Sequence, residues 1–315
     1  MDKLIVSTSP HIRTKISTQN IMADVLIALL PAAIAGGVLF GLRAVLVMAV
    51  CVASCVLAEF PFNLIVKKEQ TVKDLSAAVT GLILALCLPA KVEIWQCVVG
   101  SVFAIIIVKC LFGGIGCNFA NPAATARVFM LIAFAAAVGG GSETAFSKVD
   151  LATSATPLEL IKTDKISELP SLIDMLIGNR PGAIGETCAI ALILGGVYLI
   201  VRKVIKWQIP VVYIATVFLL SLAITQSLTV ALYEVLGGGL IIAAFFMITD
   251  YVSTPINLYG KIAFAFVCAI ITVLIRFWGN YPEGVSFAIL ITNILSPYLE
   301  KLCTRKPLGK GGKTK

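Results

Sequence analysis

The stretch MADVLIALLPAAIAGGVLFGL, residues 22–42, contains one acidic residue and no basic residue. A helix of this length crosses about 30 Å of hydrocarbon, and comparable apolar runs recur to the end of the chain. The 315 residues are 59% hydrophobic and 13% charged, about half the charge of an ordinary soluble domain. A soluble fold cannot hide so much apolar surface, whereas a bilayer solvates it. The composition therefore excludes a soluble globular protein and predicts an all-α polytopic membrane protein.

Ten membrane-spanning helices are predicted, with ends defined to within about 2–4 residues. They fall at residues 22–42, 44–65, 74–90, 94–112, 123–139, 184–201, 209–226, 229–249, 260–278 and 284–301. The chain then divides into an N-terminal segment, two halves of five spans, a long connection between the halves, and a basic tail. The N-terminal segment is residues 1–21, the first half is 22–139 and the connection is 140–183. The second half is residues 184–301, and the basic tail is 302–315.

Basic residues set the orientation of these spans, because cytoplasmic connections are enriched in Lys and Arg. An even number of spans places both termini on one side, and 17 of the 25 Lys and Arg residues then fall on that side against seven on the other. We therefore predict a multi-pass protein of the inner (cytoplasmic) cell membrane, with both termini in the cytoplasm and residues 140–183 outside. A connection of this length in a compact bundle is more often functional than passive.

The two halves share short sequence similarities. TGLIL (80–84) parallels GGLII (238–242), and GCNFANP (116–122) parallels GNYP (279–282). Two five-span halves must be inverted relative to each other, which is the plan of many transporters. Chance similarity in a glycine-rich membrane protein is the alternative interpretation.

Familiar soluble-enzyme sites are missing from the chain. Its nine cysteines form no Cys-x-x-Cys pair and it has a single histidine, His11, so we expect no metal site and interpret the cysteines as packing residues. GIGCNF (114–119) lacks the third glycine of a dinucleotide-binding fingerprint. The net charge of +8 lies in short connections and the tail, where it orients spans, so nucleic acid is not an expected partner.

Ionisable residues in or near spans are the remaining candidates for chemistry, because each is costly in hydrocarbon unless paired or hydrated. Most of them lie near span ends and are expected to reach the interface. Glu59 and Arg127 are the deepest, either on an ion path or in the wall of a ligand pocket, with a structural ion pair as the alternative. Asp250 follows the eighth span, where the backbone is either re-entrant or an ordinary cytoplasmic loop. The full set is Asp24, Glu59, Lys109, Arg127, Glu186, Glu234, Asp250 and Arg276.

The outer connection contains DLATSATPL (150–158) followed by ELIK (159–162). Pro157 suits the first position of a helix, and a hydroxyl just before it commonly accepts a backbone N–H. The pattern therefore predicts a short helix from Pro157 with Thr156 as its N-cap.

This motif resembles the covalent flavin attachment site of the NqrB/RnfD family, which contains subunits of the Rnf electron-transport complex and of the sodium-translocating NADH:quinone reductase. Further stretches carry the resemblance along the whole chain, and their order among the spans is specific. They are residues 9–12, 22–31, 113–116, 121–123, 245–250 and 281–288.

The resemblance implies that FMN is joined through its phosphate to the hydroxyl of Thr156 by a separate flavin transferase. Thr153 and Ser154 are then expected to contact the flavin. A noncovalent riboflavin is also implied, and we expect its site at the polar breaks 113–122 and 248–255. This chain itself is expected to bind no metal and to carry no complete active site.

The family further implies a membrane flavoprotein subunit of an ion-translocating ferredoxin:NAD⁺ oxidoreductase, embedded in lipid with iron–sulfur, peripheral flavin and six-span membrane subunits as partners. Its role is to relay electrons while the complex moves Na⁺ or H⁺ outward. A small-solute channel or secondary transporter with a five-plus-five repeat, and a passive membrane scaffold, are the alternatives.

Overall fold

The structure is a computed structural model that describes residues 17–67, 70–140, 142, 156–163 and 165–303. Within these ranges the regular structure is helical, and one isolated antiparallel bridge joins Ser142 to Gly182. The prediction of an all-α polytopic fold is confirmed. Six of the nine cysteines are buried, as expected of packing residues.

The first half forms a series of helices that differ widely in length. Two start at residues whose side chains cap them: Ser17 accepts from Asn20 N, and Asn121 accepts from Ala123 N and Ala124 N. The helices are α1 Thr18–Phe40, α2 Leu42–Ile65, the 3-10 helix η1 Val72–Asp74, α3 Ser76–Leu86, α4 Ile94–Val102, the π-helix η2 Phe103–Cys110, α5 Pro122–Ala133 and α6 Ala135–Val138.

The connection and the second half also consist of helices that differ in length. The connection contains α7 Pro157–Lys162, the 3-10 helix η3 Ile166–Glu168 and α8 Leu172–Ile177. The second half contains α9 Ala189–Val201, α10 Gln208–Thr225, α11 Leu228–Leu236, α12 Leu240–Ile242, the π-helix η4 Ala243–Met247, α13 Leu258–Trp278 and α14 Val285–Cys303.

All ten predicted spans contain helix, but in several of them the helix is short or broken. The spans predicted at 74–90, 123–139 and 184–201 hold α3, α5 and α9, which have eleven, twelve and thirteen residues, and at 1.5 Å per residue none of these helices alone reaches across about 30 Å of hydrocarbon. The span predicted at 229–249 is broken at Gly237–Gly239 and bends by 63°. Among the described residues, α1, α2, α10 and α13 are single helices long and apolar enough to cross a membrane, and the number is five when the bent pair is counted as one span. The total of ten crossings stays a prediction.

The packing of helices repeats between the two halves. In the first half α2 packs on α3 and α4, and in the second half α10 packs on α11 and α13. Across the halves α1 packs on α9 and α5 packs on α14. The matched contacts favour an internal repeat over chance similarity, because helices in the same order make the same kinds of contact.

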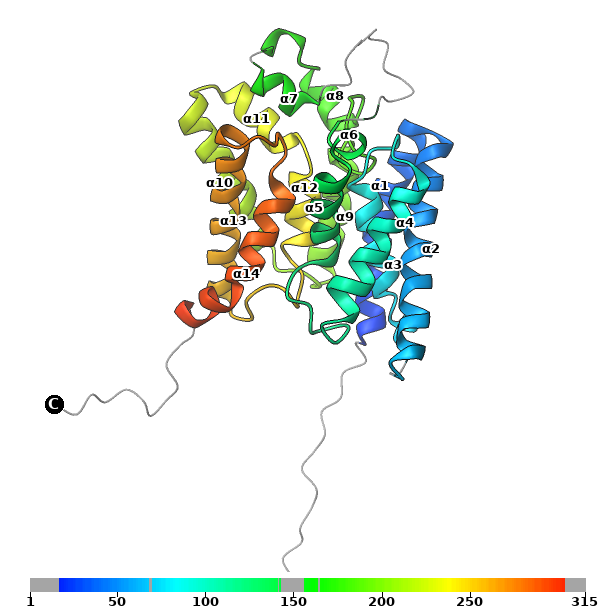
Figure 1. The fold of residues 1–315 in the computed structure, drawn as a ribbon. Helices are drawn as coiled ribbons and strands as arrows, with labels where there is room; N and C mark the ends of the chain where they lie inside the picture. The colour runs from blue at the N-terminus through cyan, green and yellow to red at the C-terminus, as the bar shows by residue number, and fades with distance from the viewer. Residues whose placement is uncertain (1–16, 68–69, 141, 143–155, 164, 304–315) are drawn as a thin grey trace, which may run out of the picture.

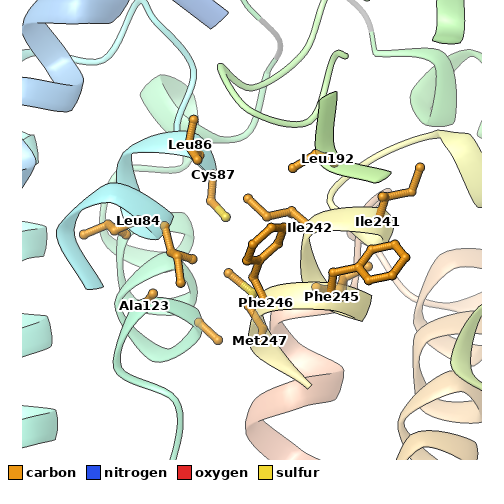
Figure 2. Close-up of a cluster of buried hydrophobic side chains, with 14 of the residues drawn as sticks. Leu84, Leu86, Cys87, Ala123, Leu192, Ile241, Ile242, Phe245, Phe246 and Met247 are labelled. Atoms are coloured by element: carbon orange, nitrogen blue, oxygen red, sulfur yellow. The ribbon is translucent and has the colours of Figure 1, made fainter. Parts of the chain in front are cut away.

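The broken helices of the two halves meet in the core. Figure 2 shows apolar side chains of α3 and α5 facing those of α12 and η4, with Leu192 of α9 beside them. Leu84, Leu86, Ile242 and Ala244 are fully buried there. The core therefore forms where short helices meet, and the longer α1, α2, α10 and α13 surround it (Figure 1).

The bundle has two distinct ends. The start of α1 and the end of α14 lie at one end, which we call the terminal end, and α7 and α8 lie at the opposite end, which we call the α7 end (Figure 1). The arrangement agrees with the prediction that the termini share a side and the long connection lies on the other. Which end faces the cytoplasm stays a prediction.

Small residues allow the closest helix contacts, as is common in membranes. A Cβ on Gly195 of α9 would stand 2.0 Å from the carbonyl oxygen of Ala28 in α1. One on Gly81 of α3 would stand 2.8 Å from the carbonyl oxygen of Cys51 in α2. Backbone cannot yield as a flexible side chain can, so these contacts require glycine.

We predict that Gly195→Ala lowers the stability of the folded chain by about 1–3 kcal/mol, because the added methyl forces α1 away from α9. Gly37→Ala is the matched control, since its Cβ meets only a methyl group of Val45 at 3.1 Å. Thermal unfolding in detergent measures both. Equal midpoints for the two variants would contradict the close contact.

Candidate functional site

Thr156 begins the short helix α7. Its backbone is extended, with φ −73° and ψ 154°, and Oγ1 accepts a 3.4 Å hydrogen bond from Glu159 N. Pro157 occupies the first helical turn, and Thr156 is 7% exposed. The predicted helix start and N-cap are therefore confirmed. Thr153 and Ser154, the expected flavin contacts, lie outside the described residues.

Helix α7 rests on the break between α11 and α12. A Cβ on Gly237 would stand 3.0 Å from Leu158 Cδ2, and one on Gly238 would stand 2.8 Å from Leu158 Cδ1. Gly238 also has φ +62°, a conformation that L side chains rarely adopt. At the other end of α7, Lys162 Nζ donates to the carbonyl oxygen of Gly279. Helix α7, which begins after Thr156, therefore packs directly on the break between α11 and α12.

The broken end of α11 is capped by Arg276 from α13. Its guanidinium forms an ion pair with Glu234 at 2.9 Å and donates to the carbonyl oxygens of Glu234, of Gly237 at 3.2 Å and of Glu283 at 3.0 Å. Carbonyls at a helix C-terminus have no intrahelical partner and carry partial negative charge, which a cation satisfies. Arg276 is 4% exposed, so this cap lies inside the bundle.

Two more arginines and two more glutamates complete a buried polar cluster. Arg180 donates to the carbonyl oxygens of Leu236 at 2.8 Å and Glu186 at 2.7 Å. Arg127 pairs with Glu283 at 2.9 Å, while Nη1 of Arg127 is buried without a partner among the described residues. Arg127, Glu186 and Glu283 line one small cavity of about 10 Å³. Charged groups of both signs therefore surround the break beneath α7.

Glu59 belongs to a different cluster near the terminal end. Its carboxylate pairs with Lys109 of η2 at 2.8 Å and accepts from Thr71 Oγ1 at 2.6 Å. Lys109 also donates to Ser76 Oγ at 2.7 Å. Glu59 and Lys109 are both buried, and Glu59 Oε2 has no partner among the described residues. The structure thus places Glu59 and Arg127, the two deepest predicted residues, in separate ion pairs.

A larger cavity of about 100 Å³ lies at the terminal end. It is lined by residues of both polar breaks, among them Ile115, Asn118, Thr249 and Asp250. Val79, Ile83, Phe245 and Phe246 supply apolar walls, and Ser76, Thr80 and Lys109 supply polar groups. Asn118 Oδ1 is buried without a hydrogen-bond partner in the described part of the chain. The cavity can therefore hold a mainly apolar ligand with polar edges.

The two polar breaks are joined at this cavity. The side-chain amide of Asn293 connects them: its nitrogen donates to the carbonyl oxygen of Ser253 at 3.2 Å, and its oxygen accepts from the backbone nitrogen of Asn121 at 3.0 Å. Asp250 forms a turn by accepting from Ser253 Oγ at 2.9 Å and Val252 N at 3.4 Å. Burial raises the pKa of Asp250, and these hydrogen bonds oppose that rise. Asp250 is therefore a turn residue in the cavity wall, and the turn follows the end of η4.

Glu59 and Arg127 were predicted as the deepest charged residues, but the two clusters around them were not predicted from the sequence. Lys109, Glu186, Glu234 and Arg276 were expected to reach the interface, whereas each is buried and hydrogen-bonded inside the bundle. That expectation was wrong because neighbouring elements cover these span ends: Arg276 lies against the break after α11, and Lys109 lies against Glu59 and Ser76. The glycine run 237–239 was the available signal, since a helix broken inside the membrane needs polar groups for its free ends.

A family model described as the NQR2, RnfD, RnfE family matches residues 5–309. The chain belongs to this family. The matched range includes Thr156, the broken helix and both charged clusters. The resemblance drawn from the sequence is thereby confirmed.

Relatives of similar length support the same family membership, and each is the subunit lettered D of its complex. The chain is similar to that of the Na(+)-translocating ferredoxin:NAD(+) oxidoreductase complex of Acetobacterium woodii, with 44% identity over 97% of this chain and 95% of the relative. It is similar to that of the proton-translocating ferredoxin:NAD(+) oxidoreductase complex of Clostridium ljungdahlii, with 39% identity over 94% of this chain and 93% of the relative. The relative from the ion-translocating oxidoreductase complex of Methanosarcina acetivorans is 30% identical over 98% of each chain.

We predict that Arg276→Leu lowers the free energy of unfolding by about 3–5 kcal/mol, because it leaves Glu234 and the broken end of α11 buried without their cation. Arg202→Gln is the control, because Arg202 pairs with Asp24 at 3.2 Å but its side chain is 55% exposed. That control is expected to lose less than about 1 kcal/mol. Thermal unfolding of the purified chain compares them, and similar losses in both would show that Arg276 does not hold the break.

Proposed function

We propose that this chain is the RnfD-type membrane flavoprotein subunit of an ion-translocating ferredoxin:NAD⁺ oxidoreductase. It relays electrons through FMN attached to Thr156 and contributes to outward movement of Na⁺ or H⁺ by the assembled complex. The chain alone carries no complete active site, and the iron–sulfur, peripheral flavin and six-span membrane subunits supply the others. The family membership and the complexes to which its relatives belong support this proposal.

The position of Thr156 is the observation that carries the proposal. Its hydroxyl oxygen lies at the amino end of α7, beside the N–H of Glu159. This helix end favours a nearby negative charge, which suits a phosphoester at Oγ1. Thr156 would hold FMN through its phosphate, with Thr153 and Ser154 as further contacts, and the bound group would supply electron transfer. A threonine hydroxyl is a poor nucleophile, so a separate flavin transferase makes the bond.

The rest of the α7 end orients this attachment point. Leu158 packs on Gly237 and Gly238, and Lys162 donates a hydrogen bond to the carbonyl oxygen of Gly279. Both ends of α7 are therefore held to the second half of the bundle. Arg276 holds the break on which Leu158 rests. A covalent tether on a fixed helix keeps a redox group at high effective concentration beside its partners. We infer that this end faces the outside of the inner membrane, with both termini in the cytoplasm.

We further propose that a second, noncovalent flavin binds at the cavity of the terminal end. The isoalloxazine of riboflavin has flat apolar faces and polar edges, and the cavity offers Ile83 and Phe246 beside polar groups. Asn118 Oδ1, buried without a partner in the described chain, is a suitable acceptor for an N–H of such a ring. The two flavin sites would then lie at opposite ends of the bundle.

We predict that the tryptic peptide Val149–Lys162, isolated from the complex of the native host, fluoresces as a flavin and fragments with FMN on Thr156. The phosphoester links the two covalently, so the adduct survives denaturation. Mass spectrometry of the peptide measures it. An unmodified peptide from fully active complex would remove the covalent flavin and favour a transporter or a scaffold.

Substitution of Thr156 separates the attachment from the helix cap. Thr156→Ala is expected to abolish covalent flavin and to destabilise α7 by about 1 kcal/mol through loss of the cap. Thr156→Ser keeps a capping hydroxyl and is expected to keep the fold. Thr163→Ala is the matched control at the other end of α7, where the hydroxyl donates only to carbonyl oxygens of its own helix. In-gel flavin fluorescence reports attachment, and fluorescence of the Thr156→Ala chain would place the flavin elsewhere.

The cavity at the terminal end gives a separate prediction. Thr80→Phe fills it, so acid-released flavin is expected to fall toward zero while the adduct on Thr156 remains. Val197→Phe adds the same bulk to the 48% exposed outer face of α9 and is expected to change neither flavin. Quantification of released flavin per chain compares the variants. Undiminished release from Thr80→Phe would place any noncovalent flavin outside this cavity.

A further inference from the structure

A groove of about 810 Å³ opens on the side of the bundle at the α7 end, apart from both proposed flavin sites. One wall is the first two turns of α2, with Leu42, Leu46 and Val47, and the other is Val92, Ile94 and Trp95 at the start of α4. Leu42 is 82% exposed and Ile94 is 50% exposed. The floor and walls of the groove are therefore mainly apolar.

The groove lies at the level of lipid headgroups. Helix α2 has 24 residues and is about 36 Å long, so it extends beyond about 30 Å of hydrocarbon and its first turn stands at the boundary. Trp95 is half exposed and its indole N–H donates to Glu93 Oε2 at 2.8 Å, an amphipathic arrangement typical of the membrane interface. The groove continues onto the exposed apolar flank of α2 at Val45 and Leu46.

Arg43 stands in this groove with an uncompensated charge. Its Nε donates to the Ala90 carbonyl at 3.0 Å, and Nη2 donates to the Lys91 carbonyl at 3.1 Å. None of the ion pairs found among the described residues includes Arg43. Two neutral acceptors fix the guanidinium but leave its charge and the remaining N–H groups for another partner.

The carboxylate of Glu93 also lines the groove, and its negative charge remains because its hydrogen-bond donors are neutral. Glu93 is the N-cap of α4, where its side chain accepts from the backbone of Gln96 while the Gln96 side chain accepts from Glu93 N. It also accepts from the Trp95 indole. Lys91, whose carbonyl accepts from Arg43, is a second cation beside the groove. Arg43 and Lys91 together outweigh the single charge of Glu93, so the rim keeps a net positive charge that attracts an anion, and the interior of the groove accepts an aliphatic chain.

We propose that this groove binds one anionic phospholipid, with its phosphate at Arg43 and an acyl chain between Leu46 and Ile94. A phosphate matches the planar guanidinium, which is held in place by the Ala90 and Lys91 carbonyls. The chain follows the apolar flank of α2 into the bilayer. The site is independent of the flavin proposals, because none of its residues belongs to α7, to the buried clusters or to the cavity at the terminal end.

Tryptophan quenching tests the site with the full-length chain in lipid vesicles. The chain has three tryptophans, so Trp207→Phe with Trp278→Phe leaves Trp95 as the sole emitter. Vesicles contain equal amounts of phosphatidylglycerol and phosphatidylcholine, with bromine on the acyl chains of one lipid at a time. We expect brominated phosphatidylglycerol to quench Trp95 at least about twofold more than brominated phosphatidylcholine. Equal quenching by the two lipids, or quenching by neither, would overturn the proposal.

Two comparisons complete the test. A chain with Trp278 as its sole tryptophan is the reference, because Trp278 is 68% exposed and lies outside the groove, and it should be quenched equally by both lipids. Arg43→Gln in the Trp95-only chain should remove the preference, whereas Arg202→Gln should keep it. If Trp95 is still quenched more by phosphatidylglycerol in the Arg43→Gln chain, Arg43 does not hold the phosphate. If the Arg43→Gln chain does not fold, the comparison of the two lipids in the chain that keeps Arg43 decides the proposal.

Discussion

A helix broken inside a membrane must have polar groups at its free ends, and the bond network of Arg276 meets this requirement for α11. The guanidinium binds the carbonyls of Glu234 and Gly237 and the carboxylate of Glu234, all inside the bundle. Water cannot satisfy these groups in hydrocarbon, so the arginine is what allows the glycine break to exist. The break in turn forms the surface on which Leu158 of α7 rests. One buried cation therefore links the membrane-embedded helices to the segment that begins at Thr156.

The same principle organises the first half. Helix α3 is too short to cross the bilayer, and its start lies beside Lys109, which bonds Ser76 and Glu59. Short helices leave room between them, and the cavity at the terminal end forms where α3, η4 and the two polar breaks meet. The packing of α1 on α9 and α5 on α14 holds the halves together around this space. The two ends of the bundle thus carry two different candidate sites on one repeated architecture.

The sequence predicted those features that depend on local chemistry. Apolar length located helix within each of the ten predicted spans, and the hydroxyl before Pro157 identified the cap of α7, but the short α8 in the connection was not predicted. It could not predict that Arg276, Glu234 and Glu186 point inward, because inward and outward faces cannot be distinguished in a span that is apolar all round. Nor could it predict the groove at Arg43, which depends on the approach of α2 to residues 90–95. Pairings such as Lys109 with Glu59 join residues 50 positions apart and follow only from the packed fold.

Ferredoxin-dependent reduction of NAD⁺ by the purified intact complex tests the proposal that electrons pass through this chain at Thr156. Complexes carrying Thr156→Ala or Thr163→Ala are compared after their subunit composition has been shown to equal that of the wild type. We expect the Thr156→Ala complex to assemble but to lose this activity, while the Thr163→Ala complex retains it. Wild-type rates from the Thr156→Ala complex would rule out electron transfer at Thr156 and leave the chain a scaffold.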